Sequence, residues 1–484
     1  MAAKDKKEDQ VKATKKASKK DKYKELAAEY PNLWDVATEE QIERIYAMGE
    51  EYKRYLDAGK TEREFVNLTV EEATRNGFVE IHTVAELVPG QRIYKSIKGK
   101  GLMLAVIGKQ DVSQGFNILG AHIDSPRLDL KPNPLYEEAD MAYLKTHYYG
   151  GIKKYQWPTI PLALHGMVIR RDGSQIYLQI GEREEDPIFY ITDLLPHLGT
   201  EQMSKKATEV IRGEDLNLLI GGRPVPEKDV SQRFKMAILD HLHKEYGMVE
   251  KDLVSAEIEI VPAMKARDVG FDRSFVASYG HDDKVCSFPA LMALFEQELP
   301  EKTVVVMLSD KEETGSYGNT GAQSRLYEGF LVEVYAKVMG GYDELGYRKA
   351  IENTRMLSAD VTNGYDPNFA SVSDPRNAAY LSKGVVMEKY TGARGKSGTS
   401  DANAEFFSSI LRVFAKQNVP WQTGELGKID AGGGGTIAVY LANMGMEVID
   451  CGVPVLSMHA PYEVISKADL YFTYMAYKVF VEAS

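Results

Sequence analysis

The sequence predicts an α/β fold: a three-layer sandwich around a mostly parallel sheet, with an inserted β-rich second domain. Two observations predict it. Short apolar runs alternate with amphipathic stretches through most of the chain, as in proteins whose parallel strands are joined by helices. Within this pattern, residues 150–192 become strand-like around a turn signal. With 484 residues the chain is long enough for two domains.

The elements of the first part follow in order. Residues 1–24 are rich in lysine and lack an apolar core, so we expect a solvated and partly disordered tail rather than a secretory signal. Apolar residues recur at helical spacing over 38–75, which predicts amphipathic helices. Strand-like runs follow at 101–108 and 116–124.

The middle of the chain interrupts this pattern. Residues 164–182 (LHGMVIRRDGSQIYLQIGE) predict a β-hairpin that turns at Arg-Asp-Gly, and the charged stretch near 201–247 predicts helix. From 253 the alternation of strands and helices resumes, starting with the strand-like run 254–263. We therefore expect one domain over 25–130 and 253–484, and an inserted domain over 131–252.

Composition excludes several classes of protein. The net charge of −12 leaves no basic surplus for neutralising phosphates, so we expect no nucleic-acid partner. No run of about 18 apolar residues is present, so no membrane span is predicted. Cys286 and Cys451 are too few for a disulfide framework, which favours a reducing, cytoplasmic compartment. We expect both thiols to be small buried hydrophobic groups.

Acids and histidines gather where predicted strands end or helices begin. His122 ends an apolar run and Asp124 follows on the same face of an extended segment. Taken alone, this His-x-Asp pair is more typical of a structural histidine. Four further stretches add similar residues, namely Asp282, Asp283, Glu312, Glu313, Asp360 and His459. Because ligands of open α/β sheets bind at the carboxyl ends of strands, we expect the five stretches to converge.

The donor types indicate metal ions. Two histidines with several carboxylates and no thiolate suit a pair of divalent cations such as zinc, manganese or cobalt. Adjacent Glu312 and Glu313 repel each other and are costly to desolvate together, and bound cations would offset that charge. The glycine run at 431–436 lacks the lysine of a nucleotide-binding loop, so we expect it to let the backbone pass close to a substrate.

Six short motifs in order carry a resemblance to a known family: GAHIDSP, GHDDKVCSF, DKEETGS, SADVTNGYDPN, AGGGGTIA and MHAPYE. From about residue 38 onward the chain resembles the M18 family of dizinc metallo-aminopeptidases, the group of aspartyl aminopeptidase and aminopeptidase I. The resemblance implies a dizinc peptidase sandwich that removes the N-terminal residue of peptides. It also implies a dimerisation or oligomerisation domain inserted after the first histidine motif.

The resemblance assigns the metal ligands residue by residue. His122 and Asp360 would hold one ion, Glu313 and His459 the other, and Asp282 would bridge them. Two divalent ions per chain are implied, with zinc favoured over cobalt or manganese.

It also assigns catalytic roles. Glu312 would be the general base and Asp124 would support His122. Members form tetrahedral dodecamers built from dimers, in which a histidine of the neighbouring subunit's insertion reaches the active site, and His197 lies in the matching kind of segment.

Some alternatives stay open. Typical aspartyl aminopeptidases have His-Pro-Asn where this chain has Asp366-Pro367-Asn368, so both an acidic and a neutral or aliphatic N-terminal preference remain. Another dizinc hydrolase of the same fold is the main rival, either an amidohydrolase or a carboxypeptidase. The carboxypeptidase would need an arginine clamp such as Arg376 or Arg394. A noncatalytic oligomeric scaffold is the third reading.

Overall fold

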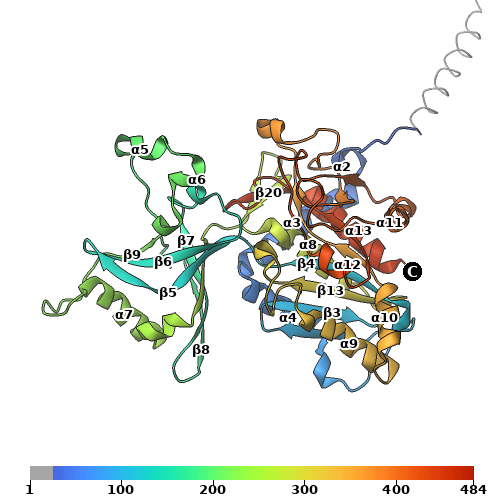
Figure 1. Ribbon diagram of the computed structural model, residues 1–484, viewed down its shortest axis with the longest axis horizontal. Helices are drawn as coiled ribbons and strands as arrows, with labels where there is room; N and C mark the ends of the chain where they lie inside the picture. Colours follow the sequence, from blue (N-terminus) through green and yellow to red (C-terminus); the bar gives the residue numbers. More distant parts are fainter. Residues whose placement is uncertain (1–25, 484) are drawn as a thin grey trace, which may run out of the picture.

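The chain folds into two lobes, each built on its own β-sheet (Figure 1). This computed structural model describes residues 26–483, so the tail expected over 1–24 lies outside the described residues. The larger lobe contains a nine-stranded sheet and both ends of the described chain, and the smaller lobe contains a six-stranded sheet.

The nine-stranded sheet is mostly parallel. Its four central neighbours β13, β4, β14 and β18 all run in the same direction, so their carboxyl ends meet at one edge. In spatial order the strands are β1 (Val79–Glu80), β2 (Arg92–Ile97), β3 (Gly101–Val106), β13 (Thr303–Ser309), β4 (Phe116–His122), β14 (Arg355–Ser358), β18 (Glu447–Gly452), β16 (Val385–Glu388) and β17 (Trp421–Thr423).

Helices cover both faces of this sheet and complete three layers. Alternate residues of β13 point to opposite sides: Val304 and Val306 belong to one apolar core, Val305 and Met307 to the other. The first core is covered by α2 (Leu33–Val36), α3 (Glu39–Ala58), α4 (Glu62–Arg75), α8 (His281–Phe295), α11 (Ala404–Lys416) and α13 (Lys467–Glu482). The second is covered by α9 (Arg325–Met339), α10 (Glu344–Glu352) and α12 (Ala438–Ala442). The predicted sandwich is confirmed.

The two helices predicted over 38–75 begin at capping boxes. The Thr38 hydroxyl accepts a hydrogen bond from the Gln41 amide (3.2 Å), and the Gln41 side chain accepts one from the Thr38 amide (3.0 Å). Thr61 and Glu64 repeat the arrangement at the start of α4. These reciprocal bonds satisfy amides that have no partner within a helix, which explains why both helices begin where they do.

The six-stranded sheet is antiparallel throughout. In spatial order its strands are β8 (Gln175–Ile180), β7 (Leu162–Ile169), β10 (Glu257–Pro262), β5 (Arg127–Glu138), β6 (Met141–Tyr149) and β9 (Leu218–Gly221). Strands β7 and β8 form the hairpin that residues 164–182 predict. The side chains of Leu128, Leu164 and Ile260 lie in a separate apolar core of this lobe.

Of two expectations for the middle of the chain, one is confirmed in part and the other is wrong. The stretch 201–247 is not one helical region, because Gly-Gly-Arg-Pro-Val-Pro at 221–226 prevents a continuous helix. It forms α5 (Thr200–Met203), α6 (Ala207–Val210), strand β9 and α7 (Arg233–Tyr246). The run 254–263 does not belong to the main sheet, since β10 pairs with β5 and β7. The second sheet therefore extends beyond the expected limits of 131 and 252.

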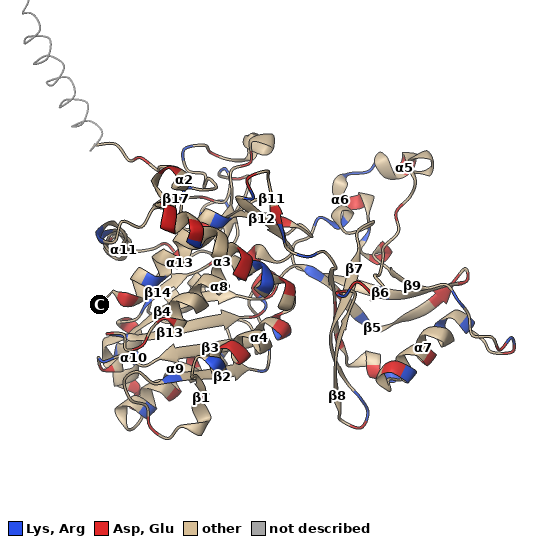
Figure 2. Cartoon of the chain, turned by 180° about the vertical axis from the view of Figure 1, so that it is seen from behind, with Lys and Arg blue, Asp and Glu red and all other residues tan. Residues whose placement is uncertain are grey.

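Short strands link the remaining loops. They are β11 (Arg267–Val269), β12 (Phe275–Ser278) and β20 (Glu463–Ser466) in one small sheet, and β15 (Thr362–Asn363) and β19 (Pro454–Val455) in another. Both acidic and basic residues occur on the helices of each lobe (Figure 2). Within residues 26–483 no helix is long and apolar enough to cross a bilayer. Cys286 and Cys451 are both free and buried, as expected.

Candidate active site

The strand register brings the predicted site residues to one edge of the large sheet. His122 is the last residue of β4 and pairs with Ser309, the last residue of the parallel strand β13. Glu312 and Glu313 follow β13 in a short 3₁₀ helix, η7 (Glu312–Thr314), and Asp360 comes two residues after β14. Asp282 lies in the first turn of α8, and His459 lies in the loop between β19 and β20.

These side chains form two groups that could each hold a metal ion. The first contains His122, Asp282 and Asp360, and the second contains Asp282, Glu313 and His459. Within each group the candidate ligand atoms all lie within 4.8 Å of one another. These are the two ligand sets that the resemblance implies, and Asp282 belongs to both.

The two carboxylate oxygens of Asp282 face different histidines. His122 Nε2 lies 3.0 Å from Asp282 Oδ1, and His459 Nε2 lies 3.3 Å from Asp282 Oδ2. Asp360 Oδ1 is 3.9 Å from His122 Nε2, and Glu313 Oε2 is 3.4 Å from His459 Nε2. One carboxylate between two donor sets is the geometry of a bridging ligand.

The second aspartate of the pair has a different role. Asp283 Oδ2 accepts a hydrogen bond from the His122 backbone amide (3.2 Å), so this side chain faces strand β4. Burial raises the pKa of Asp283 well above its usual range. Asp282 is therefore the candidate bridge, as the resemblance favours.

Both histidine rings are oriented through their Nδ1 atoms. His122 Nδ1 lies 3.1 Å from the Asp124 carbonyl and 3.2 Å from Asp124 Oδ1. His459 Nδ1 lies 2.9 Å from the Gly151 carbonyl. Each carbonyl can only accept, so a proton on Nδ1 leaves Nε2 free to bind a cation.

The electrostatics of the cluster also fit metal binding. Burial raises the pKa of Glu313 and of Asp360 well above the usual range. Glu313 Oε1 is buried and has no hydrogen-bond partner among the described residues. Buried acids without a compensating cation are costly, and a nitrogen and oxygen donor set suits zinc. The residues present therefore fit a pair of divalent ions.

Glu312 differs from its neighbour. No ion pair joins it to either histidine within the described chain, although it lines the same cavity. Burial raises the pKa of Glu312 to about 7. A cavity-lining carboxylate that belongs to neither candidate metal group is placed to accept and release a proton, as a general base does.

The Asp124 carboxylate places both glutamates. Its Oδ1 accepts a hydrogen bond from the Glu312 amide (3.1 Å), and its Oδ2 accepts one from the Glu313 amide (3.3 Å). The resemblance implies only that Asp124 supports His122. The sequence does not reveal the hydrogen bonds of Asp124 to the loop that carries Glu312 and Glu313, because that loop lies almost 190 residues away along the chain.

The cluster opens into a cavity of about 450 Å³ that is lined by acids, glycines and apolar side chains. Gly433, Gly434 and Gly435 of the predicted glycine run form part of its wall. A Cβ atom on Gly433 would collide with the Gly392 carbonyl oxygen, so close backbone contact requires glycine there.

Sequence reasoning missed one acid in this cavity. Glu388 ends strand β16, lines the cavity and accepts a hydrogen bond from the Thr362 hydroxyl. Burial raises the pKa of Glu388 to about 8. The signal was present, since the apolar run at 385–387 ends in this glutamate as other runs end in proposed ligands.

His197 is not brought to the cluster. It lies in the exposed 3₁₀ turn η4 (Pro196–Leu198) of the smaller lobe. Among the described residues it makes no hydrogen bond or ion pair with the clustered acids. A role for His197 in catalysis would therefore require that it reach the active site of a neighbouring subunit.

Comparison with known proteins identifies the family. The family model described as "Aminopeptidase I zinc metalloprotease (M18)" matches residues 55–481. The chain belongs to the M18 family. This M18 peptidase is accordingly a metallo-aminopeptidase, a hydrolase of a zinc metalloprotease family.

Curated relatives and solved structures support the same family. A probable M18 family aminopeptidase 1 of Clostridium acetobutylicum is 49% identical over 461 residues, which is 94% of this chain and 99% of the relative. The crystal structure of an M18 aminopeptidase from Thermotoga maritima has a TM-score of 0.91 and 43% identity, over 94% of this chain and 100% of that one. The S. cerevisiae mApe1 dodecamer has a TM-score of 0.72 over 90% of this chain and 96% of that one, and at 19% identity it shows the fold alone.

Proposed function

We propose that this M18 peptidase releases the N-terminal residue of peptides at a centre of two divalent cations, and that it prefers neutral or aliphatic N-terminal residues to acidic ones. The observation that carries the proposal is the position of Asp282, whose two oxygens face His122 and His459. In this scheme Asp360 completes the first ion's ligands and Glu313 completes the second's.

The catalytic roles follow from the contacts. When bound, two such ions supply charge that acidifies a shared water and polarises the scissile carbonyl. Glu312 accepts the proton of the attacking water and passes it to the leaving amine. Asp124 holds the Glu312 amide, so the carboxylate of the base stays aimed at the cavity. The acidic cavity wall attracts the free α-ammonium group of the substrate.

The lining of the cavity supports the substrate preference. Among the described residues no lysine or arginine lines it, whereas Glu388 adds a further acid and Leu426, Val439 and Met458 add apolar surface. A carboxylate side chain of a substrate would be desolvated there without a lysine or arginine partner, at a cost of about 3 kcal/mol. An aliphatic side chain would gain from burial.

The same lining disfavours a carboxypeptidase. Such an enzyme needs an arginine to clamp a terminal carboxylate. Arg376 is exposed, and Arg394 does not line the cavity beside the cluster but an adjoining one of about 60 Å³, which shares Thr391 and Leu426 with it. The complete ligand sets and Glu312 likewise argue against a noncatalytic scaffold.

The test is a panel of aminoacyl chromogenic substrates, each with an N-acetylated control. Hydrolysis of free-amine Leu and Met substrates, at least tenfold faster than of Glu and Asp substrates, is expected. Cleavage of the acetylated forms would contradict the aminopeptidase proposal. Faster cleavage of the acidic substrates would contradict the proposed preference.

We further propose a homo-oligomer in the cytoplasm, specifically a tetrahedral dodecamer of dimers joined through the smaller lobe. Large apolar side chains cluster in sequence on that lobe and are more than half exposed: Leu194, Leu195, Leu198 and Met203. His197 lies among them, so this surface could carry it to a neighbouring subunit's cavity. Light scattering coupled to size exclusion would give the mass, and a monomer would contradict the proposal.

A further inference from the structure

The smaller lobe reaches into the active site through residues 149–151, directly after strand β6. Tyr149 is the last residue of β6, and its hydroxyl donates a hydrogen bond to Asp124 Oδ2 (2.7 Å). Two residues later, the Gly151 carbonyl accepts from His459 Nδ1 (2.9 Å). Between them Gly150 has φ +75°, and a Cβ added there would lie 3.4 Å from Glu313 Cβ. Two residues of one lobe therefore bond site residues of the other, and the glycine between them leaves little room for a side chain beside a third.

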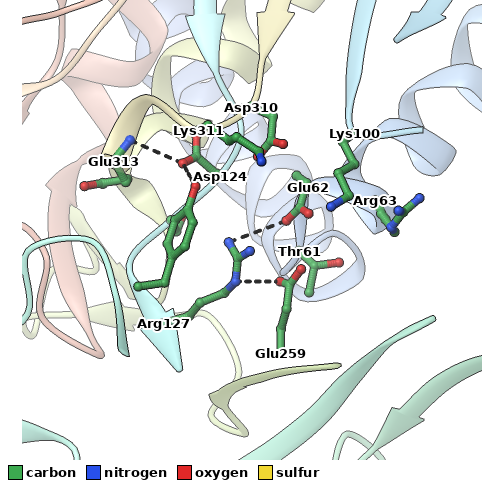
Figure 3. A network of polar contacts seen from close by, with 12 residues as sticks. Thr61, Glu62, Arg63, Lys100, Asp124, Arg127, Glu259, Asp310, Lys311 and Glu313 are labelled. Carbon is green, nitrogen blue, oxygen red and sulfur yellow. Dashed lines mark hydrogen bonds and ion pairs between the residues drawn. The ribbon is translucent and has the colours of Figure 1, made fainter. Parts of the chain in front are cut away.

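Asp124 is the point at which these contacts converge. Its carboxylate lies beside the His122 ring and accepts the amide hydrogens of Glu312 and Glu313. The Tyr149 hydroxyl bonds the same oxygen that accepts from Glu313. Figure 3 shows the Asp124 carboxylate and its bond to the Glu313 amide. Three of its four partners belong to a candidate ligand ring, the candidate base and a second candidate ligand, and the fourth is the Tyr149 hydroxyl. The position of this carboxylate therefore affects how all three site residues are oriented.

A buried ion network holds Tyr149 in place. The Arg127 guanidinium lies over the Tyr149 ring, with its carbon 4.0 Å from the ring centroid, and the two residues are register partners in β5 and β6. Arg127 Nε is 3.2 Å from Glu259 Oε2 on β10, and Arg127 Nη1 is 3.6 Å from Glu62 Oε2 on α4. Figure 3 shows these acids beside the guanidinium, between the two lobes. The network ties the tyrosine to the six-stranded sheet and to helix α4 of the larger lobe.

We propose that Tyr149 is a positioning residue for the reaction: its hydroxyl fixes the Asp124 carboxylate, and Asp124 in turn aims Glu312, Glu313 and His122. The smaller lobe is then part of the catalytic apparatus as well as a surface for assembly. This inference rests on the proposed function of the clustered residues. Tyr149 touches none of the reacting atoms itself, so its effect must pass through Asp124.

Tyr149→Phe removes the hydroxyl and keeps the ring under Arg127. Tyr148→Phe is the matched control, since Tyr148 precedes Tyr149 on the same strand, is 42% exposed and points to the other side. Both proteins are prepared as the full assembly. Three quantities are measured: kcat and KM on a Leu substrate, the zinc dissociation constant by competition with a chelator, and the midpoint of thermal unfolding.

For Tyr149→Phe we expect kcat to fall by about 10–100-fold with KM within about twofold, and zinc to bind about tenfold more weakly, as for other supporting partners of metal ligands. Tyr148→Phe should match the wild type in its kinetic constants, its zinc affinity and its unfolding midpoint. Equal kcat and equal zinc affinity in the two variants would overturn the inference. The inference would also be overturned if kcat fell only because the unfolding midpoint was lower, so that activity measured at a lower temperature returned to the wild-type value.

The variant Gly150→Ala tests independently whether residues 149–151 position the active site. A side chain there is strained at φ +75° and presses toward Glu313, so kcat should fall while KM stays nearly constant. A Gly150→Ala enzyme with unchanged kcat, together with an unaffected Tyr149→Phe enzyme, would show that residues 149–151 do not position the site. If the wild type hydrolysed no aminoacyl substrate, the proposed function itself would fail, and the zinc measurement would still test the role of Tyr149.

Discussion

Glu313 Oε2 lies 3.4 Å from His459 Nε2, whereas Glu312, the residue before it, forms no ion pair with either clustered histidine in the described chain. Both amides are held by the same Asp124 carboxylate, so the difference between the two glutamates lies in where their side chains point. Glu313 joins a candidate metal group, and Glu312 lines the cavity without joining one.

This difference predicts opposite results for two isosteric variants. Glu312→Gln should lower kcat by at least about 10³-fold and leave the metal content unchanged, since it removes a proton acceptor and no ligand. Glu313→Gln should lose both metal and activity. Turnover and elemental analysis of the purified proteins check the pair. Loss of metal in Glu312→Gln, with metal retained in Glu313→Gln, would show that the assignment is reversed.

The cavity wall predicts how substrate preference can be changed. Glu388→Lys places a cation where Glu388 now lines the cavity, so kcat/KM for Glu and Asp substrates relative to Leu should rise by about tenfold or more, about 1.4 kcal/mol. Glu388→Gln is the control, because it removes the acid without adding a positive charge. An unchanged ratio in Glu388→Lys, in a protein that still cleaves Leu substrates, would mean that Glu388 does not face the substrate side chain.

A buried histidine between the lobes predicts a pH dependence of stability. His165 Nδ1 lies 2.7 Å from Glu64 Oε1 and Nε2 lies 3.1 Å from Glu182 Oε1, while Lys60 and Lys265 also pair with Glu182. Burial opposes protonation, but the hydrogen bonds to Glu182 and Glu64 outweigh it and raise the pKa of His165. The added stability is therefore full below the ordinary pKa of 6.5 and is lost as pH rises through the raised pKa.

His165→Gln should then reduce the free energy of unfolding by about 2 kcal/mol at pH 6, the value of hydrogen bonds to charged groups, and by less at pH 9. Urea unfolding at both pH values measures the difference. His82→Gln serves as the control, because the His82 side chain is 67% exposed. A loss of stability in His165→Gln that is the same at both pH values would contradict the charged state assigned to this histidine.

How far the sequence predicts this structure depends on how local each feature is. The alternation of apolar runs and helices predicts the sandwich, and strand ends predict the stretches that bear His122, Asp282 and Asp360. The sequence does not predict the sheet to which the run 254–263 belongs, because a buried strand has the same apolar pattern in either sheet and only its pairing with β5 and β7 decides its place. Contacts such as Tyr149 with Asp124 depend on how two lobes meet, which no local pattern encodes.

The proposed centre holds two divalent cations that share Asp282 as a ligand, and the metal stoichiometry of the purified chain shows whether it does. Elemental analysis of the purified wild-type chain should find close to two equivalents of divalent metal, and removal by a chelator should abolish hydrolysis of a Leu substrate until zinc is returned. Asp282→Asn should weaken the binding of both equivalents together. A protein that is fully active with no bound metal, or that loses only one of two ions in Asp282→Asn, would contradict the account.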